Sequence, residues 1–220
     1  LPHWAGYNGE QPVRVGNGAA THLQYDVYGE MVLALTPLFL DARFRESVTP
    51  ELLDLVTRLS HKAIKVAGEP DAGIWEYRTA MRPQTFSTVM CWAAVDRMKR
   101  IADRYTPHRS AELAAEAARI RDVILKDAVH ATGGHLVADH GGLEVDAALL
   151  QAVTLRLFEP GDPRAHATVD AVIRDLSQDG WLRRYRVDDG FGVPTVAFTL
   201  CTLWLVEALA AIGRKDEARA

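Results

Sequence analysis

Apolar residues recur at the spacing of an α-helix along most of this chain of 220 residues. Positions i, i+3, i+4 and i+7 are apolar in one segment after another, whereas the alternation typical of a half-buried strand is scarce. An amphipathic helix has to bury its apolar stripe against another element, so a chain of such helices is confined to helix-on-helix packing. The sequence therefore predicts an all-α fold.

The ends of several helices are marked by residues that start or stop them. Thr49 followed by Pro50 is an N-cap with proline at the first helical position, and Gly68 stops the same helix. The first helix is expected from about Thr21, and Pro37 is expected to kink or end it. The remaining helices are expected over residues 86–104, 110–128, 145–157, 163–176 and 198–212, which makes seven in all.

Two kinds of helix alternate along the chain. Residues 86–95 and 198–206 are apolar almost all round, which is typical of buried helices. Residues 51–66 and 110–128 carry a charged face, which is expected to contact water. An inner ring of buried helices covered by an outer ring of amphipathic helices would bury every apolar stripe. We therefore expect two layers of helices.

Composition excludes several classes of protein. The net charge is −4 and no basic run exceeds two residues, so there is no footprint for a nucleic-acid backbone. The longest apolar runs, 31–40 and 196–206, are shorter than the ~20 residues that span a membrane. Cys91 and Cys201 lie in apolar helical patterns and are predicted to be buried, reduced thiols. No secretory signal is recognisable, so a cytoplasmic location is expected.

A loop between two predicted helices, residues 71–78, places an acidic residue between two aromatic ones. Glu76 lies between Trp75 and Tyr77. Aromatic neighbours that exclude water favour the protonated form of a carboxyl group, and such an acid is able to protonate a leaving oxygen. We therefore expect Glu76 to be shielded and to act as a general acid. The residues alone leave open a second interpretation, an ion pair between Glu76 and Arg78 at the end of a loop.

A second loop, residues 181–191, combines arginine, aspartate and aromatic side chains ahead of a buried helix. Sugar sites use this mixture, because guanidinium and carboxylate groups bind hydroxyl groups in pairs while aromatic rings cover the apolar face of the sugar. A surface loop of ion pairs is the alternative that the residues leave open.

Neither a metal site nor a cofactor site is expected. His22, Asp26 and Glu30 recur every four residues on one helix face, but this spacing is common on hydrogen-bonded faces, and no second cluster completes a coordination shell. The sequence also contains no phosphate-binding glycine loop, no dinucleotide-binding motif and no nucleophile elbow.

Several separate blocks, in order along nearly the whole chain, resemble glycoside hydrolase family 15, the family of bacterial glucoamylase-like proteins. The blocks are GYNG at 6–9, PVRVGN at 12–17, QYDVYGE at 24–30, DAGIWE at 71–76, FSTVMCW at 86–92, residues 184–189, and FTLCTLW at 198–204. The resemblance implies an (α/α)6 barrel and inverting hydrolysis of α-glucosidic bonds by two carboxyl groups, one acid and one base. An α-glucan or α-glucoside is the substrate that it implies.

The resemblance also implies roles for single residues. Glu76 falls on the general acid. The residues that it assigns to sugar binding are Trp75 at the subsite of the bond being cleaved, Arg184 and Asp188 at sugar hydroxyl groups, Gln24 and Asp26 near the floor of the pocket, and Tyr7.

Two features of the family have no counterpart here. The motif that carries the base does not occur before Ala220, and neither the N-terminal β-sandwich nor the first barrel helices match. We expect residues 1–220 to be one incomplete catalytic domain, inactive alone and able to self-associate through exposed barrel edges. The alternatives are a trehalase or glucodextranase of the same family, and a non-catalytic helical module that binds sugar or is purely structural. Thr195, where many relatives carry glutamate, favours the last.

Overall fold

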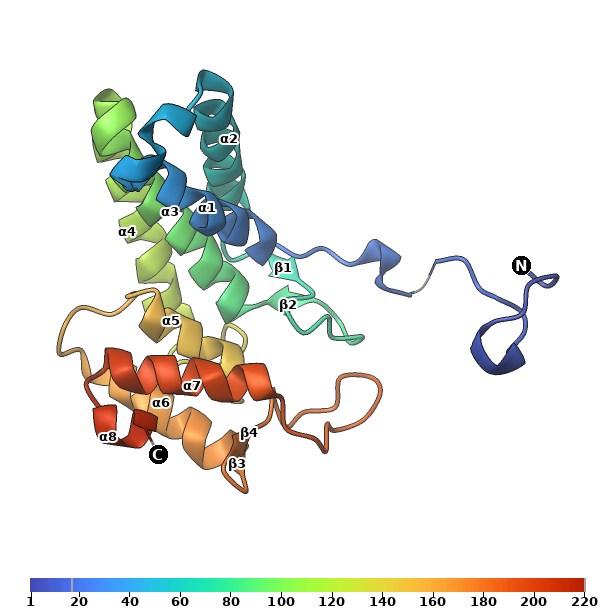
Figure 1. Ribbon diagram of the computed structural model, residues 1–220. Helices are drawn as coiled ribbons and strands as arrows, with labels where there is room; N and C mark the ends of the chain where they lie inside the picture. The colour runs from blue at the N-terminus through green and yellow to red at the C-terminus, as the bar shows by residue number, and fades with distance from the viewer. Residues whose placement is uncertain (17, 220) are drawn as a thin grey trace.

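The computed structural model describes residues 1–16 and 18–219, which form an all-α protein as predicted (Figure 1). The helices are α1 (Asp26–Leu40), α2 (Pro50–Val66), α3 (Thr85–Tyr105), α4 (Ser110–Asp127), α5 (Leu150–Thr154), α6 (Pro163–Leu176), α7 (Thr199–Ala211) and α8 (Lys215–Arg219). Two antiparallel strand pairs lie between them, β1 (Pro70–Asp71) with β2 (Arg82–Pro83), and β3 (Ser177–Gln178) with β4 (Trp181–Leu182). Within this part of the chain, no helix is long and apolar enough to cross a membrane.

The helix boundaries follow the capping residues where these are strong. The Thr49 hydroxyl accepts a hydrogen bond from the Leu52 backbone N–H at 3.2 Å, and α2 begins at Pro50 as predicted. The helix ends at Val66, and Gly68 follows in the left-handed region with φ 84°. Glycine is the expected residue after the end of a helix, because it adopts the left-handed conformation without steric cost.

The first helix begins later than predicted and continues past Pro37. It begins at Asp26 and not near Thr21, because the preceding segment pairs with the loop after β1. The Leu23 carbonyl oxygen accepts the Ala72 N–H at 2.8 Å, which takes this segment out of the helix. Pro37 does not end α1, which continues to Leu40. The helix expected over residues 145–157 is a short 3-10 turn followed by α5, and α8 was not predicted.

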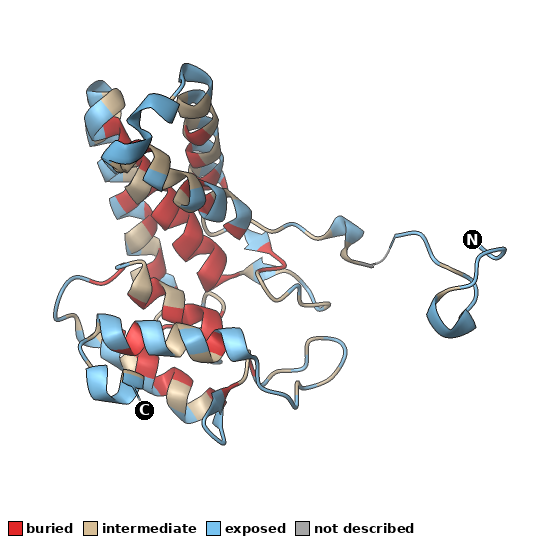
Figure 2. Cartoon of the chain, in the orientation of Figure 1, coloured by how far each residue is buried: buried red, intermediate tan, exposed pale blue. Residues whose placement is uncertain are grey.

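The centre of the core is α3, which was predicted to be an inner helix. Fourteen of its residues are buried, and it packs against α1, α2 and α4 (Figure 2). Its contact with α1 is unusually close at Gly29, where an added Cβ atom would lie 2.2 Å from the Met90 carbonyl oxygen. The two helices can approach to this distance only because residue 29 has no side chain.

The helix α7 is only partly buried, which corrects the prediction of an inner helix. One side packs on α5, α6 and α8 and buries Cys201 and Leu209. The other side exposes Leu200, Leu203 and Val206, which are 43%, 56% and 40% exposed. The sequence pattern could not show this, because an apolar helix looks the same whether or not all of its neighbours are present.

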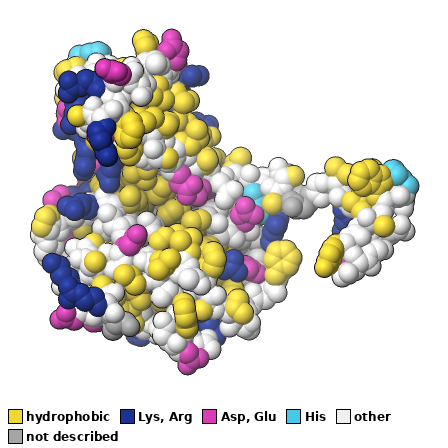
Figure 3. Space-filling view, viewed as in Figure 1, with side chains coloured by type: hydrophobic (Ala, Val, Ile, Leu, Met, Phe, Trp, Pro, Cys, Tyr) yellow, Lys and Arg dark blue, Asp and Glu magenta, His cyan; other side chains and the backbone are white. Residues whose placement is uncertain are grey.

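The helix α1 has a similar open face. Val27 and Met31, one turn apart, are 41% and 40% exposed. Seen from the side of Figure 1, hydrophobic side chains gather over α1 and α7 (Figure 3). We call these two surfaces the open faces of α1 and α7. Contiguous apolar surface of this kind is typical of a site that another protein element covers.

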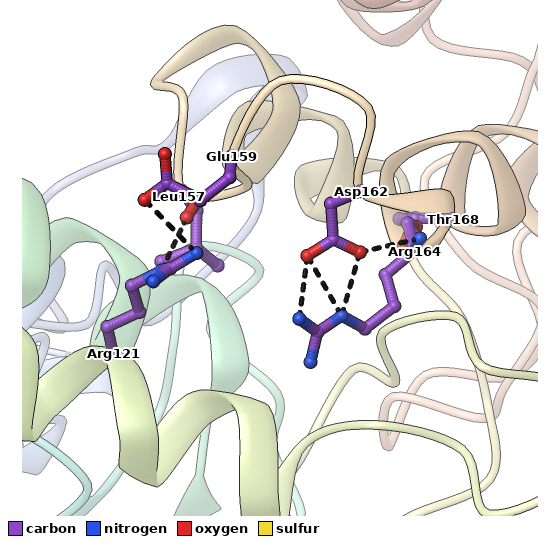
Figure 4. A network of polar contacts seen from close by, with 6 residues as sticks. All are labelled: Arg121, Leu157, Glu159, Asp162, Arg164 and Thr168. Carbon is purple, nitrogen blue, oxygen red and sulfur yellow. Dashed lines mark hydrogen bonds and ion pairs between the residues drawn. The ribbon is translucent and has the colours of Figure 1, made fainter.

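The loop between α5 and α6 is fastened to its surroundings by two arginines (Figure 4). Arg121 of α4 donates to the Leu157 carbonyl oxygen at 2.9 Å and lies 3.5 Å from the Glu159 carboxylate. Asp162 caps α6 by accepting from the Arg164 N–H at 3.0 Å, and it also binds the Arg164 guanidinium. These contacts attach the start of the loop to α4 and its end to the first turn of α6.

The loops that lead into α1, α3, α5 and α7 meet at one end of the bundle (Figure 1). Thr85 at the start of α3 donates to the Ala138 carbonyl oxygen at 2.9 Å. Ala147, just before α5, donates to the Arg184 carbonyl oxygen at 2.8 Å. Residues far apart in the sequence are therefore brought to one edge by backbone hydrogen bonds.

The substitution Gly29→Ala should destabilise the fold despite the better helix propensity of alanine, which is worth about 1 kcal/mol. The new methyl group would overlap the Met90 carbonyl oxygen. Separating α1 from α3 should lower the free energy of unfolding by at least about 2 kcal/mol. Urea unfolding measures this, with exposed Glu30→Ala as the control that changes it by less than about 0.5 kcal/mol. Equal stability of the Gly29→Ala variant and the wild type would contradict the close contact.

Candidate active site

Glu76 lies in a tight turn between β1 and β2. Its backbone N–H donates to the Gly73 carbonyl oxygen at 3.2 Å, and residues 73–76 are called the Glu76 turn below. Glu76 has φ 52°, a left-handed conformation that non-glycine residues rarely adopt. Such a conformation persists only where the surroundings impose it, and it is concentrated at functional sites.

The segment before α1 holds one side of the turn. Asp71 is fully buried, and its carboxylate accepts from the Tyr25 N–H at 2.8 Å and the Ser87 hydroxyl at 2.7 Å. The Gln24 side-chain amide donates to the Gly73 carbonyl oxygen at 3.1 Å. Gln24, expected near the floor of a sugar pocket, is therefore an anchor of the Glu76 turn.

Trp75 holds the other side of the turn. Its indole Nε1–H donates to the Asp146 carboxylate at 3.0 Å. Its ring centroid lies 5.8 Å from that of Tyr185 and 6.2 Å from that of Trp204 on α7, within the range of aromatic contacts. The half-buried indole thus links the Glu76 turn to the segments that lead into α5 and α7.

The expectation that Trp75 and Tyr77 shield Glu76 is wrong for this structure, because the Glu76 side chain is exposed. The two aromatic rings instead pack on a third ring, that of Tyr185. Trp75 points to Asp146, and the Tyr77 ring meets the Tyr185 ring edge-on at 4.9 Å. Aromatic residues on both sides of Glu76 in the sequence therefore do not bury it.

The sequence also left open an ion pair between Glu76 and Arg78. The described residues contain no such pair. The Arg78 guanidinium lies over the Phe191 ring at 5.6 Å. The Arg78 backbone N–H donates to the Asp189 carbonyl oxygen at 2.9 Å. The chain after Glu76 is therefore attached to the second loop that the sequence singled out.

The second loop packs on the Glu76 turn. The Arg184 guanidinium lies 5.9 Å from the Trp75 ring centroid and 5.2 Å from that of Tyr185, which is a cation–π geometry. Tyr185 is 1% exposed and donates its hydroxyl hydrogen to the Asp189 carboxylate at 2.7 Å. These contacts are not those of a loose surface loop of ion pairs. Arg184 and Trp75, both predicted sugar-binding residues, are in contact.

Asp188 lies at the rim of a nearby cavity. One of its carboxylate oxygens accepts from the Gly190 N–H at 2.8 Å and the Gly192 N–H at 3.0 Å, while the side chain remains exposed. Asp188, Tyr77 and Asp71 help to line a cavity of about 350 Å³ beside the Glu76 turn. The predicted sugar-binding residue Asp188 is thus near the turn and open to solvent.

Tyr7 is not brought to this site. It is 89% exposed and lies in the N-terminal segment, which extends away from the helices (Figure 1). The expectation that Tyr7 joins the sugar-binding residues therefore has no support in this arrangement, in which few contacts fix the segment to the bundle.

Three buried carboxyl groups lie near the edge where the loops meet. Asp26 is 4% exposed, and burial, together with the negative charges of Glu30 and Asp71, raises its pKa to about 6. Burial also raises the pKa of Asp71. Asp146 is 2% exposed, and burial raises its pKa to about 7, against the effect of its hydrogen bonds. Asp26, predicted near a pocket floor, is instead almost closed off from solvent.

Sequence reasoning missed Asp146, which contacts Trp75. In the sequence it is a single aspartate at the start of a helical pattern, the usual position of an N-cap. It does cap, since one oxygen accepts from the Leu149 N–H at 3.2 Å. No sequence signal indicated that the other oxygen would bind an indole 71 residues earlier. Over residues 1–16 and 18–219, no three histidine, cysteine, aspartate or glutamate side chains are placed to hold a metal ion.

Comparisons with known proteins agree with the fold and the motifs. The family model described as glycosyl hydrolases family 15 matches residues 1–219. A trehalase of Mycobacterium tuberculosis is 39% identical over 100% of this chain and 32% of its own length. A trehalase of Thermoplasma volcanium is 31% identical over 98% of this chain and 34% of its own. The chain thus spans about a third of these relatives.

Among solved structures, a wild-type glycosidase superposes with a TM-score of 0.75 at 24% identity, covering 90% of this chain and 52% of the other. At this identity the similarity establishes the fold, and the predicted partial (α/α)6 barrel is confirmed. The fold is that of the helical-barrel glycosidases. The chain belongs to glycosyl hydrolase family 15.

The buried Asp26 should make stability depend on pH. Its pKa of about 6 in the folded protein exceeds the value of about 3.9 in unfolded chains. Between these values the folded state binds more protons, so the Asp26 contribution to the free energy of unfolding falls as pH rises through this window. Urea unfolding from pH 4 to 7 should show a smaller decline in Asp26→Asn. Asp54→Asn, on the exposed face of α2, should leave the slope unchanged, and an unchanged slope in Asp26→Asn would refute the assignment.

Proposed function

We propose that this chain carries the general acid of an enzyme that hydrolyses α-glucosidic bonds, and that Glu76 is this acid. The observation that carries the proposal is the position of the Glu76 turn at the edge where the loops before α1, α3, α5 and α7 meet. The left-handed backbone of Glu76, imposed by contacts on both sides, supports a functional role. Membership of the glycosidase family supports the reaction class.

In the proposed reaction, Glu76 gives its proton to the glycosidic oxygen as the bond to the anomeric carbon breaks. In an inverting enzyme a second carboxylate activates water on the opposite face of the sugar, with the carboxyl groups ~6.5–9.5 Å apart. The family resemblance places that base in a loop beyond Ala220, and we retain this as a prediction. Residues 1–220 then supply one half of the acid and base pair.

The sugar-binding roles proposed for Trp75 and Arg184 fit their contacts. The Trp75 indole N–H is hydrogen-bonded to Asp146, which fixes the orientation of the half-buried ring. A fixed ring is suited to packing against a sugar. The Arg184 guanidinium stacks on the same ring and retains planar N–H donors for hydroxyl groups. Exposed Asp188 is proposed as a further partner for a hydroxyl group.

An exposed carboxyl group is a poor general acid near neutral pH, so the proposal requires that Glu76 be desolvated in the working enzyme. A sugar placed against Trp75 and Arg184 would displace water from the adjacent Glu76 turn. Further barrel helices next to the open faces of α1 and α7 would enclose the same edge. We propose that both contribute, and that the Trp75 ring alone does not.

Among α-glucosides, we propose trehalose as the first substrate to test. The relatives at 39% and 31% identity are trehalases, and they match over nearly all of this chain. The resemblance to glucoamylase-like proteins keeps α-glucans as the other candidate, and glucodextranase-type linkages as a third. Product analysis of the full-length protein on trehalose, maltose and isomaltose separates the three.

The substitution Glu76→Gln should abolish most of the activity, because a carboxamide is not acidic enough to transfer a proton to the leaving oxygen. In the full-length protein we expect kcat to fall about 10²–10⁴-fold with KM little changed, which is the usual range for loss of a general acid. The matched control is Glu112→Gln on the exposed first turn of α4, which should retain the wild-type kcat. Wild-type turnover in Glu76→Gln would refute the assignment, because another group would then have to supply the proton.

We also propose that residues 1–220 form part of a longer catalytic barrel. The support comes from the open faces of α1 and α7, whose apolar residues recur at helical spacing, and from relatives about three times as long. In such a barrel further helices would cover both faces. In their absence, a second copy of the chain is the available apolar partner.

The chain of 220 residues should therefore self-associate, and Leu203→Lys on the open face of α7 should weaken this by placing a charge in the contact. Leu143→Lys is the matched control, because Leu143 is 72% exposed and lies on neither α1 nor α7 but in the loop between α4 and α5. Sedimentation at increasing protein concentration measures the association. A chain that is monomeric at every concentration and unfolds in one sharp transition would contradict the proposal.

A cytoplasmic location is the last part of the proposal. Cys91 and Cys201 are buried and free, as the sequence predicted. Free thiols are typical of proteins in reducing compartments, where disulfides are rare.

A further inference from the structure

Asp146 is a buried carboxyl group that the proposed reaction does not use. It precedes the 3-10 turn that leads into α5, and it is 2% exposed. Its two oxygens bind different segments. Oδ1 accepts from the Leu149 N–H at 3.2 Å, and Oδ2 accepts from the Trp75 indole N–H at 3.0 Å. One side chain therefore joins the 3-10 turn before α5 to Trp75, the residue before Glu76.

Helix capping alone does not account for this arrangement. A cap needs one acceptor, and Asp162 caps α6 in this way while remaining partly accessible. Burying an ionisable group is costly unless hydrogen bonds satisfy it. At Asp146 the second bond goes to Trp75, so burial and the indole contact occur together.

The surroundings of Asp146 connect it to the second loop as well. The next residue, Ala147, donates to the Arg184 carbonyl oxygen at 2.8 Å, and the Arg184 guanidinium lies over the Trp75 ring. Trp75 therefore has Asp146 at its indole nitrogen and Arg184 on its face. A change in the Trp75–Asp146 contact would move the ring on which both the Glu76 turn and Arg184 depend.

We propose that Asp146 is a positioning residue, which fixes the Trp75 indole and through it the Glu76 turn. The hydrogen-bond part of this inference stands on the geometry alone. The effect on turnover rests on the function proposed for Glu76.

The ionised form of Asp146 suits this role. Two N–H donors point at two different oxygens, and a carboxylate accepts both. A protonated carboxyl group, or an asparagine amide, turns a hydrogen toward one of these donors and weakens that bond. Burial raises the pKa of Asp146 to about 7, so the change falls near neutral pH. Ionisable groups that face Asp146 include Tyr77, Asp139, Tyr185 and Cys201, and the Arg184 guanidinium lies over the Trp75 ring.

The first test follows the Trp75 indole N–H by NMR of protein labelled with nitrogen-15 at tryptophan. Trp75→Phe assigns the signal by its disappearance. In the wild type the signal should shift with pH around a midpoint near 7 and exchange slowly with solvent. In Asp146→Asn the signal should move and its titration should disappear. A Trp75 signal with the same position and pH response in both proteins would overturn the inference.

The second test is a double-mutant cycle on turnover by the full-length protein. Asp146→Asn should lower kcat at least 10-fold with a smaller change in KM. In a Trp75→Phe background the same substitution should change kcat less than 2-fold, because the group through which it acts is already gone. Equal effects in both backgrounds would overturn the positioning role.

Asp162→Asn is the matched control, since it makes the same change at another capping aspartate, one that pairs with Arg164, and should leave kcat unchanged. If Asp146→Asn does not fold, Trp75→Phe decides the matter, because it removes the same hydrogen bond and has to reproduce the loss of kcat. A wild-type kcat in Trp75→Phe overturns the inference. If the wild-type protein hydrolyses no α-glucoside, the proposed function fails, while the NMR titration still decides whether Asp146 holds Trp75.

Discussion

The Glu76 turn depends on hydrogen bonds to buried carboxylates on either side of it. Asp71 binds the segment before α1 and the first turn of α3, and Asp146 binds Trp75. Between these two sets of contacts Glu76 holds φ 52°, a conformation that few residues other than glycine adopt. The carboxylates are costly to bury, and their hydrogen bonds offset this cost only in the observed arrangement. The left-handed backbone of Glu76 and the buried carboxylates of Asp71 and Asp146 therefore occur together in one hydrogen-bonded arrangement.

This arrangement also explains how two loops more than a hundred residues apart form one surface. Tyr77 and Tyr185 meet edge-on, and Arg184 stacks on Trp75. The groups proposed to bind sugar, Trp75 and Arg184, are consequently held by packing between rings. Such preorganisation lowers the entropy lost when a ligand binds.

The open faces of α1 and α7 show the opposite situation. Both helices are strongly apolar, and each packs well on the side where a neighbour exists. Leu203 and Met31 remain in contact with water because no helix among the described residues packs on the sides of α7 and α1 that carry them. Exposure of this kind lies on both sides of the edge that carries Glu76. Enclosure of that edge and burial of these faces would be achieved by the same additional helices.

The sequence by itself determined the helices and where most of them end. Helical periodicity and short-range caps such as Thr49 act over a few residues, so they can be read without a fold. Motif order along the chain was also enough to indicate the family and the two loops of the site. Membership of the family was then established by the comparison over residues 1–219.

Only the tertiary structure decided which side chains meet. The exposure of Glu76, the position of Tyr7 away from the helices and the contact of Asp146 with Trp75 all depend on how distant segments pack. Nothing in the local pattern distinguishes a capping aspartate from one whose second oxygen holds an indole. The physical reason is that desolvation and hydrogen bonding between loops are set by neighbours in space, and a sequence records only neighbours along the chain.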